Sequence, residues 1–341
     1  SFRLPAPASM HVAIPFLLLL QQVAAPAVAP TAPPSGDTTG YWQQRISYRI
    51  VARLDEVHEN VHATASLRYV NQSPDTLREM YFHQYLNAFR PGSRWSAVDA
   101  REGRVRFQHL RDPNYGYERF TSVPTFDGEP VAPVYPLAPD STVVKFALPR
   151  PLAPGDSIRV SMAWDARPSA GVYRRQGRRG REYDFAQWYP KVAVYDRLGW
   201  EANPLVPSGE LYGEFGTYDV TLLLPSDQVV GATGVPVQGD PGWQRVRDWG
   251  TVDAAANAYG DVAPDTSDAV PEGYRRVRFL ARDVHHFAWT VSPSFRYEGA
   301  LYGGRIPVHV LYDASAVKQW GHGLAVGMIV RALQWLESIY G

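Results

Sequence analysis

The chain has 341 residues, of which 45% are hydrophobic and 13% aromatic, and its 34 basic and 34 acidic residues balance to a net charge of zero. A neutral chain gives no electrostatic basis for binding nucleic acid. It contains no cysteine, which excludes disulfides, thiolate metal sites and cysteine nucleophiles. Lys145, Lys191 and Lys318 are the only lysines, a bias that we attribute to genome composition. The length allows about two domains.

The first 36 residues have the pattern of a secretory signal peptide and a linker. Arg3 precedes an apolar run from Val12 to Leu20, and a stretch rich in Ala and Pro follows. The run is too short and too rich in proline for a membrane span, so none is expected. Export without cysteines fits a bacterial periplasmic or secreted protein whose mature chain begins after Ala25. The alternative interpretation is a disordered Ala/Pro-rich linker.

Residues 56–64, EVHENVHAT, contain the zinc-peptidase pattern H-E-x-x-H in His58, Glu59 and His62. On a helix, two such histidines share one face and can hold one zinc ion, while the glutamate activates a bound water. On a strand the same spacing separates them by roughly 13 Å. Residues 46–54 and 63–69 alternate between apolar and polar side chains, which predicts two strands joined by a polar turn. We therefore interpret the match as coincidental.

Short strands are predicted from Tyr41 to about Val237, for example at residues 142–148, 157–164 and 217–225. A polar stretch at 251–273 predicts a long loop, and strands resume at 275–281 and 305–312.

The last segment has a different pattern. Apolar residues recur at positions 324, 328, 329, 333, 336 and 339, which predicts a helix from about His322 to Tyr340. This change of character favours a truncated protein, in which a missing helical domain would cover the apolar stripe of the helix.

Three further motifs are not expected to be functional sites. The basic run at 174–181, RRQGRRGR, is interpreted as the solvated tip of a hairpin rather than a phosphate site. His285 and His286 are expected to point to opposite faces of a strand, so they would not bind one metal together. Residues 315–318, SAVK, match the S-x-x-K of serine acyl-transfer enzymes without its partner motifs. The chain's own residues therefore define no catalytic constellation.

Several segments, in order, resemble the N-terminal region of the aminopeptidase N-type zinc metallopeptidases, the gluzincin family. The first runs from YRIVARLD to YLNAF, and the second contains RPLAPGDSIRV followed by GVYRR. YDFAQWYPKVAVYDRLGW precedes GTYDVTLLLPSDQVVGATG, and FLARDVHHFAW precedes IPVHVLYD. As an ordered series, they extend over residues 41–341.

The resemblance implies a mainly β fold. A saddle-like, multi-sheet β-sandwich domain would occupy residues 37–296, and residues 297–341 would form the first strands and helix of an α/β, thermolysin-like catalytic domain. It implies a parent enzyme that is an exported zinc-dependent aminopeptidase, hydrolysing peptide substrates from the N-terminus with zinc-activated water. In the family the zinc helix follows the β domain, so His58 and His62 match no ligand. The zinc ligands are expected beyond Gly341, and the chain alone is expected to be inactive.

The resemblance carries one site residue. In many relatives a glutamine of the β domain contacts the N-terminal residue of the substrate, and Gln187 stands near that position. One alternative is that this segment matches a later part of the family's sequence pattern. Another is that Gln187 is an ordinary polar residue of a strand. The alternative function is a non-catalytic secreted β-sandwich module that binds carbohydrate or protein through its aromatic residues.

Overall fold

The computed structural model describes residues 41–171, 175–207, 212–248 and 270–341. The predicted signal peptide and most of the predicted loop at 251–273 lie outside the described residues. Residues 42–341 form one compact unit. The domain boundary at residue 297 stays a prediction. No helix among the described residues is long and apolar enough to cross a membrane.

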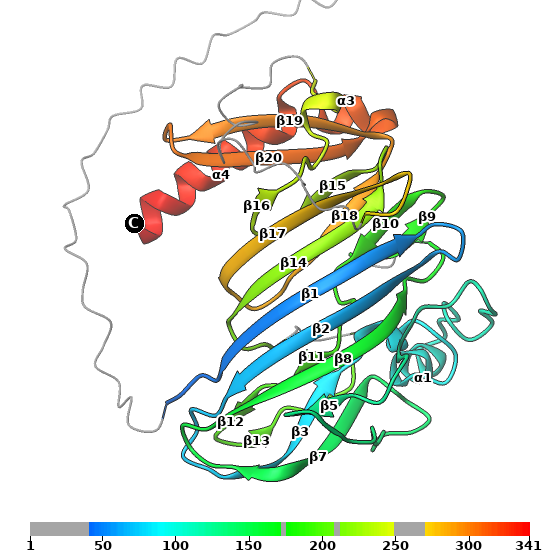
Figure 1. Cartoon of the computed structure of the whole chain (residues 1–341). Helices are drawn as coiled ribbons and strands as arrows, with labels where there is room; N and C mark the ends of the chain where they lie inside the picture. Colours follow the sequence, from blue (N-terminus) through cyan, green and yellow to red (C-terminus); the bar gives the residue numbers. More distant parts are fainter. Residues whose placement is uncertain (1–40, 172–174, 208–211, 249–269) are drawn as a thin grey trace, which may run out of the picture. The chain divides into compact units, whose positions relative to one another are not determined.

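The largest sheet among the described residues has nine strands (Figure 1). Its order is β16 (Val235–Gln238), β17 (Tyr274–Val284), β14 (Gly216–Pro225), β1 (Arg45–Asp55), β2 (Asn60–Val70), β8 (Ser157–Arg167), β5 (Thr125–Phe126) and β6 (Glu129–Pro130), and β4 (Tyr117–Phe120) also pairs with β8. β1 and β14 run parallel, whereas the other pairs are antiparallel. Burial alternates strictly along β14, which shows that one face of the sheet covers a core.

Smaller sheets pack against the buried face of this sheet. One contains β15 (Val229–Ala232), β18 (Trp289–Ser292), β10 (Glu182–Phe185) and β9 (Gly177–Arg179). A second contains β11 (Lys191–Val192), β3 (Leu77–His83) and β7 (Val143–Leu152), and a third pairs β12 (Tyr195–Asp196) with β13 (Gly199–Trp200). Residues of the first two join those of the large sheet in one hydrophobic core, so the unit is a multi-sheet sandwich.

The C-terminal segment has a separate, smaller core. The hairpin of β19 (Phe295–Tyr302) and β20 (Ile306–Asp313) packs on α4 (Leu324–Tyr340), which follows η3 (Ala314–Ala316) and α3 (Val317–Trp320). The remaining helices are η1 (Tyr85–Ala88), α1 (Arg94–Arg101) and η2 (Gln244–Val246).

Helix α4 is confirmed, whereas the partner expected for its apolar stripe stays a prediction. We expected the apolar stripe to need a partner outside the β-rich region. In the structure Ala325 and Val326 are buried against the hairpin, and Leu333 packs at its edge. The positions predicted to form the stripe are largely on other faces, with exposed fractions between 39% and 51% at 324, 328, 329, 336 and 339. The helix therefore uses its small residues for packing on the hairpin and leaves larger apolar side chains exposed.

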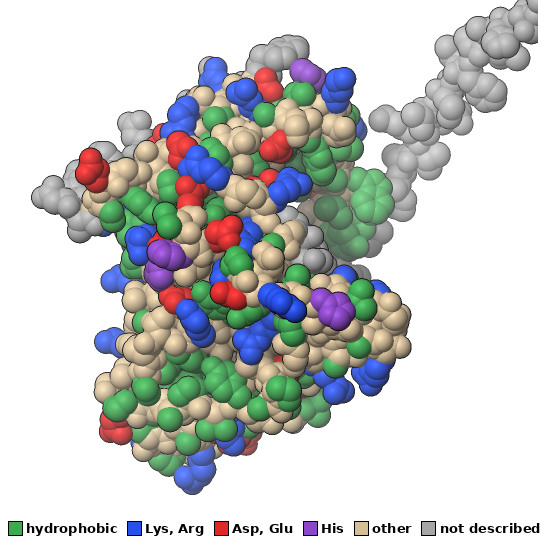
Figure 2. Space-filling model, turned by 90° about the vertical axis from the view of Figure 1, so that its right-hand side faces the viewer, with side chains coloured by type: hydrophobic (Ala, Val, Ile, Leu, Met, Phe, Trp, Pro, Cys, Tyr) green, Lys and Arg blue, Asp and Glu red, His purple; other side chains and the backbone are tan. Residues whose placement is uncertain are grey.

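The predicted strands are confirmed. Residues 142–148, 157–164 and 217–225 lie in β7, β8 and β14 with ends within a few positions, and the later strands are β17 and β20. Helix α1 was not predicted. Its first turn is capped by Ser93, whose side chain accepts a hydrogen bond from the Ser96 amide. Figure 2 shows basic and acidic side chains mixed over the upper and middle parts of one face, whereas hydrophobic side chains gather in its lower part.

Candidate functional site

The H-E-x-x-H residues lie in a β-hairpin, as predicted. His58 is in the turn between β1 and β2, and His62 is on β2 opposite Arg53. His58 Nδ1 lies 3.0 Å from Asp55 Oδ2, and His62 Nδ1 lies 2.7 Å from Asp165 Oδ1. Burial by itself would raise the pKa of Asp55. Hydrogen bonds from the His58 side chain and amide outweigh this effect and lower the pKa to about 2. Each imidazole is thus engaged by a carboxylate, without helical stacking.

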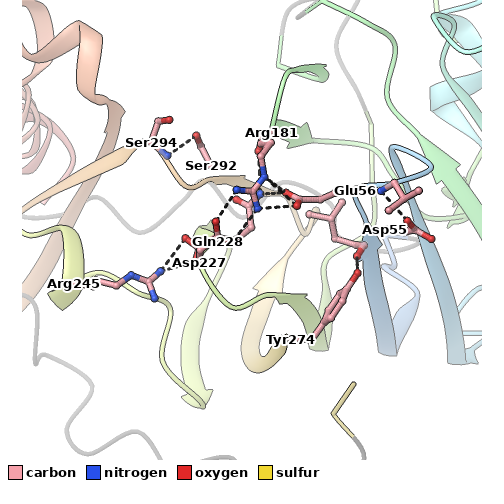
Figure 3. A network of polar contacts seen from close by, with 11 residues as sticks. Asp55, Glu56, Arg181, Asp227, Gln228, Arg245, Tyr274, Ser292 and Ser294 are labelled. Atoms are coloured by element: carbon pink, nitrogen blue, oxygen red, sulfur yellow. Dashed lines mark hydrogen bonds and ion pairs between the residues drawn. The ribbon is translucent and has the colours of Figure 1, made fainter. Parts of the chain in front are cut away.

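The described part of the basic run, residues 175–181, leads into and includes the turn of the β9–β10 hairpin, but it is not simply a solvated tip. Arg178, only 4% exposed, donates to Glu59 at 2.6 Å. Figure 3 shows Arg181 reaching both Glu56 and Asp227, with its closest contacts at 2.8 and 2.6 Å. These ion pairs tie the β9–β10 hairpin to the β1–β2 turn and to the loop after β14. We conclude that the arginines hold three segments together, which the sequence alone did not indicate.

His285 and His286 do not lie on a strand, so the predicted alternation is wrong. They follow the end of β17, and their ring centroids are 5.3 Å apart. Ser315 donates its hydroxyl to Asp313, the residue before η3, and thus supports a helical turn. Among the described residues, no three or more His, Cys, Asp or Glu side chains are arranged to hold a metal ion.

Gln187 lies in the bend between β10 and β11 rather than on a strand, and it is only 5% exposed. Its neighbour Trp188 is fully buried and fixes this bend. The Trp188 indole donates to the Phe287 carbonyl at 3.0 Å, and the Trp188 carbonyl accepts from the Trp164 indole at 2.9 Å. The interpretation of Gln187 as a polar residue of a strand is therefore wrong, whereas its proposed contact with a substrate stays a prediction.

A buried lysine stands four positions further along the same segment. Lys191 is 1% exposed, and its ammonium group has no hydrogen-bond partner among the described residues. The Tyr48 hydroxyl holds the backbone on both sides of it, donating to the Pro190 carbonyl at 3.1 Å and accepting from the Val192 amide at 2.9 Å. Burial lowers the pKa of Lys191 to about 7. Near neutral pH its amine is thus able to give up or take up a proton.

Glu214 is the acidic group that acts on Lys191. It is 3% exposed, and its carboxylate accepts a hydrogen bond from the Gln44 amide at 3.2 Å. Burial raises the pKa of Glu214 to about 7, while the Gln44 and Tyr195 backbones and the positive charge of Lys191 oppose the rise. Each partner favours the charged form of the other. Burial thus brings the pKa values of the two groups together near 7.

Three histidines around the lysine are kept neutral. His83 lies opposite Lys191 in the register of β3 and β11, and its ring stacks on Tyr85 at 4.5 Å. Burial and then the charge of Lys191 lower the pKa of His83 to about 3 and that of His286 to about 2. The same two causes lower the pKa of His285. Because these rings stay neutral, any positive charge in this cluster resides on Lys191.

Gly213 makes room for the amine. A Cβ atom at this position would lie 2.1 Å from Lys191 Nζ and 3.3 Å from the His285 carbonyl oxygen. A side chain at this position would therefore require the end of the Lys191 side chain to move. We name Lys191, Glu214, Gly213, His83 and His286 the Lys191 cluster. The sequence contained one signal for it. In a chain with 34 basic residues and three lysines, a lysine supplies what arginine does not, a cation that can lose its proton.

The described residues thus define a mainly β protein in which several sheets enclose a common core and a buried lysine–glutamate pair. No protein-family model matches the chain, and no curated protein matches it. Among solved structures, it is similar to a variant of an M1 zinc metallopeptidase from Deinococcus radiodurans, with a TM-score of 0.42 and 13% identity over 80% of this chain and 47% of that one. A two-domain M1 zinc metallopeptidase variant bound to L-tryptophan gives a TM-score of 0.44 and 13% identity over 85% and 53% of the two chains.

The chain spans about half the length of these solved structures. Similarity at this level leaves the activity of the chain to be argued from its own residues.

Proposed function

We propose that this chain is the β-rich part of an exported zinc-dependent metallopeptidase that removes residues from the N-terminus of peptides. The proposal rests on the ordered sequence resemblance and on one observation, the position of Gln187. This glutamine is the residue to which the resemblance gives a substrate contact, and it is buried in a bend that Trp188 anchors from both sides. The bend that carries Gln187 is thus fixed by its neighbour, and the oxygen of a carboxamide can accept a hydrogen bond from a substrate ammonium group.

The Lys191 cluster suits the same substrate end. An α-ammonium group is a cation, and a permanently charged lysine nearby would repel it. A lysine whose pKa is lowered to about 7 is able to release its proton when a second cation arrives, and Glu214 then supplies the negative charge. In this proposal the cluster favours peptides with a free N-terminus.

Zinc would supply the hydrolytic chemistry in such an enzyme by activating water. The described residues do not fit this metal, because none of their His, Cys, Asp and Glu side chains form a group of three or more suited to an ion. No catalytic step is therefore assigned to them. Their proposed task is to bind and orient the peptide.

The test uses the protein purified from its native host. We expect stoichiometric zinc by metal analysis and hydrolysis of aminoacyl-coumarin amides. Gln187→Ala should raise KM roughly tenfold or more for substrates with a free amine, since a hydrogen bond to a charged group contributes about 1.5 to 3 kcal/mol. N-acetylated substrates should be cleaved poorly by both proteins. Gln108→Ala is the matched control, because Gln108 is partly exposed and its side chain donates to the Arg104 carbonyl.

Absence of both zinc and hydrolysis would overturn the peptidase proposal and favour the non-catalytic binding module. Zinc and hydrolysis with an unchanged KM in Gln187→Ala would keep the enzyme and reject the role of Gln187. Export is tested separately by N-terminal sequencing of the native material. A mature chain that begins after Ala25 supports it, and one that retains Val12 to Leu20 rejects it.

A further inference from the structure

The outer face of the nine-stranded sheet contains a pocket that the peptidase proposal does not use. It lies over β2, β8 and β5, which are neighbours in the sheet (Figure 1), and encloses about 450 Å³. The side chains that matter for its chemistry are Arg68, Arg159, Ser157, Ser161, Thr125 and Asp127. A volume of this size is in the range of small-molecule sites.

Two arginines lie side by side in the lining of the pocket. Arg68 on β2 and Arg159 on β8 are direct partners in the register of the two strands, and both are exposed. Like charges placed directly opposite each other destabilise a sheet. Among the described residues, neither arginine has a carboxylate within ion-pair distance, and Arg68 makes one long contact of 3.4 Å to the Ser157 hydroxyl. The pair thus presents two guanidinium groups whose charge is not balanced locally.

The single acid in the pocket does not balance this charge, because its oxygens already have partners. Asp127 Oδ1 accepts the backbone amide of Arg159 at 2.9 Å, and Asp127 Oδ2 accepts from the Arg150 side chain at 2.9 Å. The charge of Asp127 is therefore compensated by a third arginine at the edge. An anion that enters this space meets a net positive charge.

Hydroxyl groups lie beside the arginine pair. Ser161 is the register partner of Ser66 on one side and of Thr125 on the other, one alternate position along β8 from Arg159. Guanidinium groups bind carboxylates and phosphates in a bidentate way, and serine and threonine exchange hydrogen bonds with the hydroxyls of a sugar. We propose that this pocket binds an acidic sugar, a saccharide unit that carries a carboxylate or a phosphate. The proposal is independent of the peptidase activity, since the Lys191 cluster is buried rather than on this face.

Calorimetric titration of the full protein with four probes tests the proposal. We expect glucuronate and glucose 6-phosphate to bind more tightly than neutral glucose and more tightly than inorganic phosphate. The double variant Arg68→Gln/Arg159→Gln should bind both acidic sugars at least about tenfold more weakly, because each lost hydrogen bond to a charged group is worth more than 1 kcal/mol. Arg296→Gln, which removes one exposed arginine from β19, should bind as the native protein does.

Comparison of glucuronate with glucose 6-phosphate also shows whether the pocket prefers the carboxylate of a uronate or the phosphate of a phosphorylated sugar. The double variant should melt at or above the native temperature at low salt, since its like-charge pair is gone, so that lost binding cannot reflect unfolding. Equal affinity for glucose and glucuronate would overturn recognition of the charge. Equal affinity for inorganic phosphate and glucose 6-phosphate would overturn recognition of the sugar. Native affinity in the double variant, or no binding of either acidic sugar, would overturn the site.

Discussion

Replacement of Lys191 by methionine should make the protein more stable. Burial lowers the pKa of Lys191 from 10.5 to about 7, so the unfolded chain holds this proton more tightly than the folded chain. One pKa unit corresponds to about 1.4 kcal/mol. The folded state therefore loses roughly 5 kcal/mol wherever both states carry the proton, which is below about pH 7. The loss shrinks as the pH rises and ends above the unfolded pKa of 10.5.

Urea unfolding at a series of pH values measures this effect. In the native protein Lys191 should make the free energy of unfolding rise between pH 7 and 10.5. Glu214 acts in the opposite sense, because its raised pKa lowers stability as the pH increases from 4.5 to about 7. Lys191→Met keeps an unbranched side chain, shorter by the charged nitrogen, and removes the charge, so it should abolish the upper slope. At pH 6 we expect a gain of a few kcal/mol, up to about 5.

Lys145→Met is the matched control. Lys145 lies 2.6 Å from the Glu79 carboxylate in a partly exposed pair, so its loss should lower stability slightly and leave the upper slope in place. If Lys191→Met is less stable than the native protein at pH 6 and keeps the slope above pH 7, the amine is not desolvated and the reasoning fails. Increased stability with reduced peptidase activity would match a residue retained for function.

Three further outcomes are expected. The double variant His58→Ala/His62→Ala should keep the bound zinc and the activity of the native protein, and loss of stoichiometric zinc would contradict the hairpin interpretation. Gly213→Ala would place a Cβ atom 2.1 Å from Lys191 Nζ, so it should lower the melting temperature and shift the Nζ resonance, whereas an unchanged resonance would show that the lysine is not packed there. Hydrogen exchange should protect residues 324–333 of α4 more strongly than its last turns, because the buried residues of the helix lie in its first half; uniform protection would show a second contact.

The sequence predicted the β architecture well because a strand that covers a core with one face must alternate. β1, β2 and β14 do so almost without interruption. α1 was missed because it is short and mostly polar, and its main signal is the cap at Ser93. The apolar–polar pattern of the sequence therefore predicted the strands that bury alternate residues, and it did not predict the short polar helix.

The candidate site was predicted less completely. Gln187 was proposed through a resemblance and its role stays a prediction, whereas Lys191 was not proposed at all. A lysine within YPKVAVYD is compatible with an exposed strand residue, and its burial depends on β3 and on the segment that contains Gly213. Contacts between segments so far apart in the chain leave no local periodicity. The arginines of the β9–β10 hairpin were misjudged for the same reason, since their acidic partners belong to other loops.

The parallel pairing of β1 with β14 has a consequence for synthesis of the chain. Ile46 pairs with Gly216, and the nearby Gln44 bonds Glu214; the two residues of each pair are 170 positions apart in the chain. At typical rates of translation, roughly 10 to 30 s pass between the emergence of the two strands. During this time the β1–β2 hairpin has an open edge that is suited to pairing with another chain. The exposed Arg45 and Arg49 charge one face of that edge, which disfavours aggregation until β14 arrives.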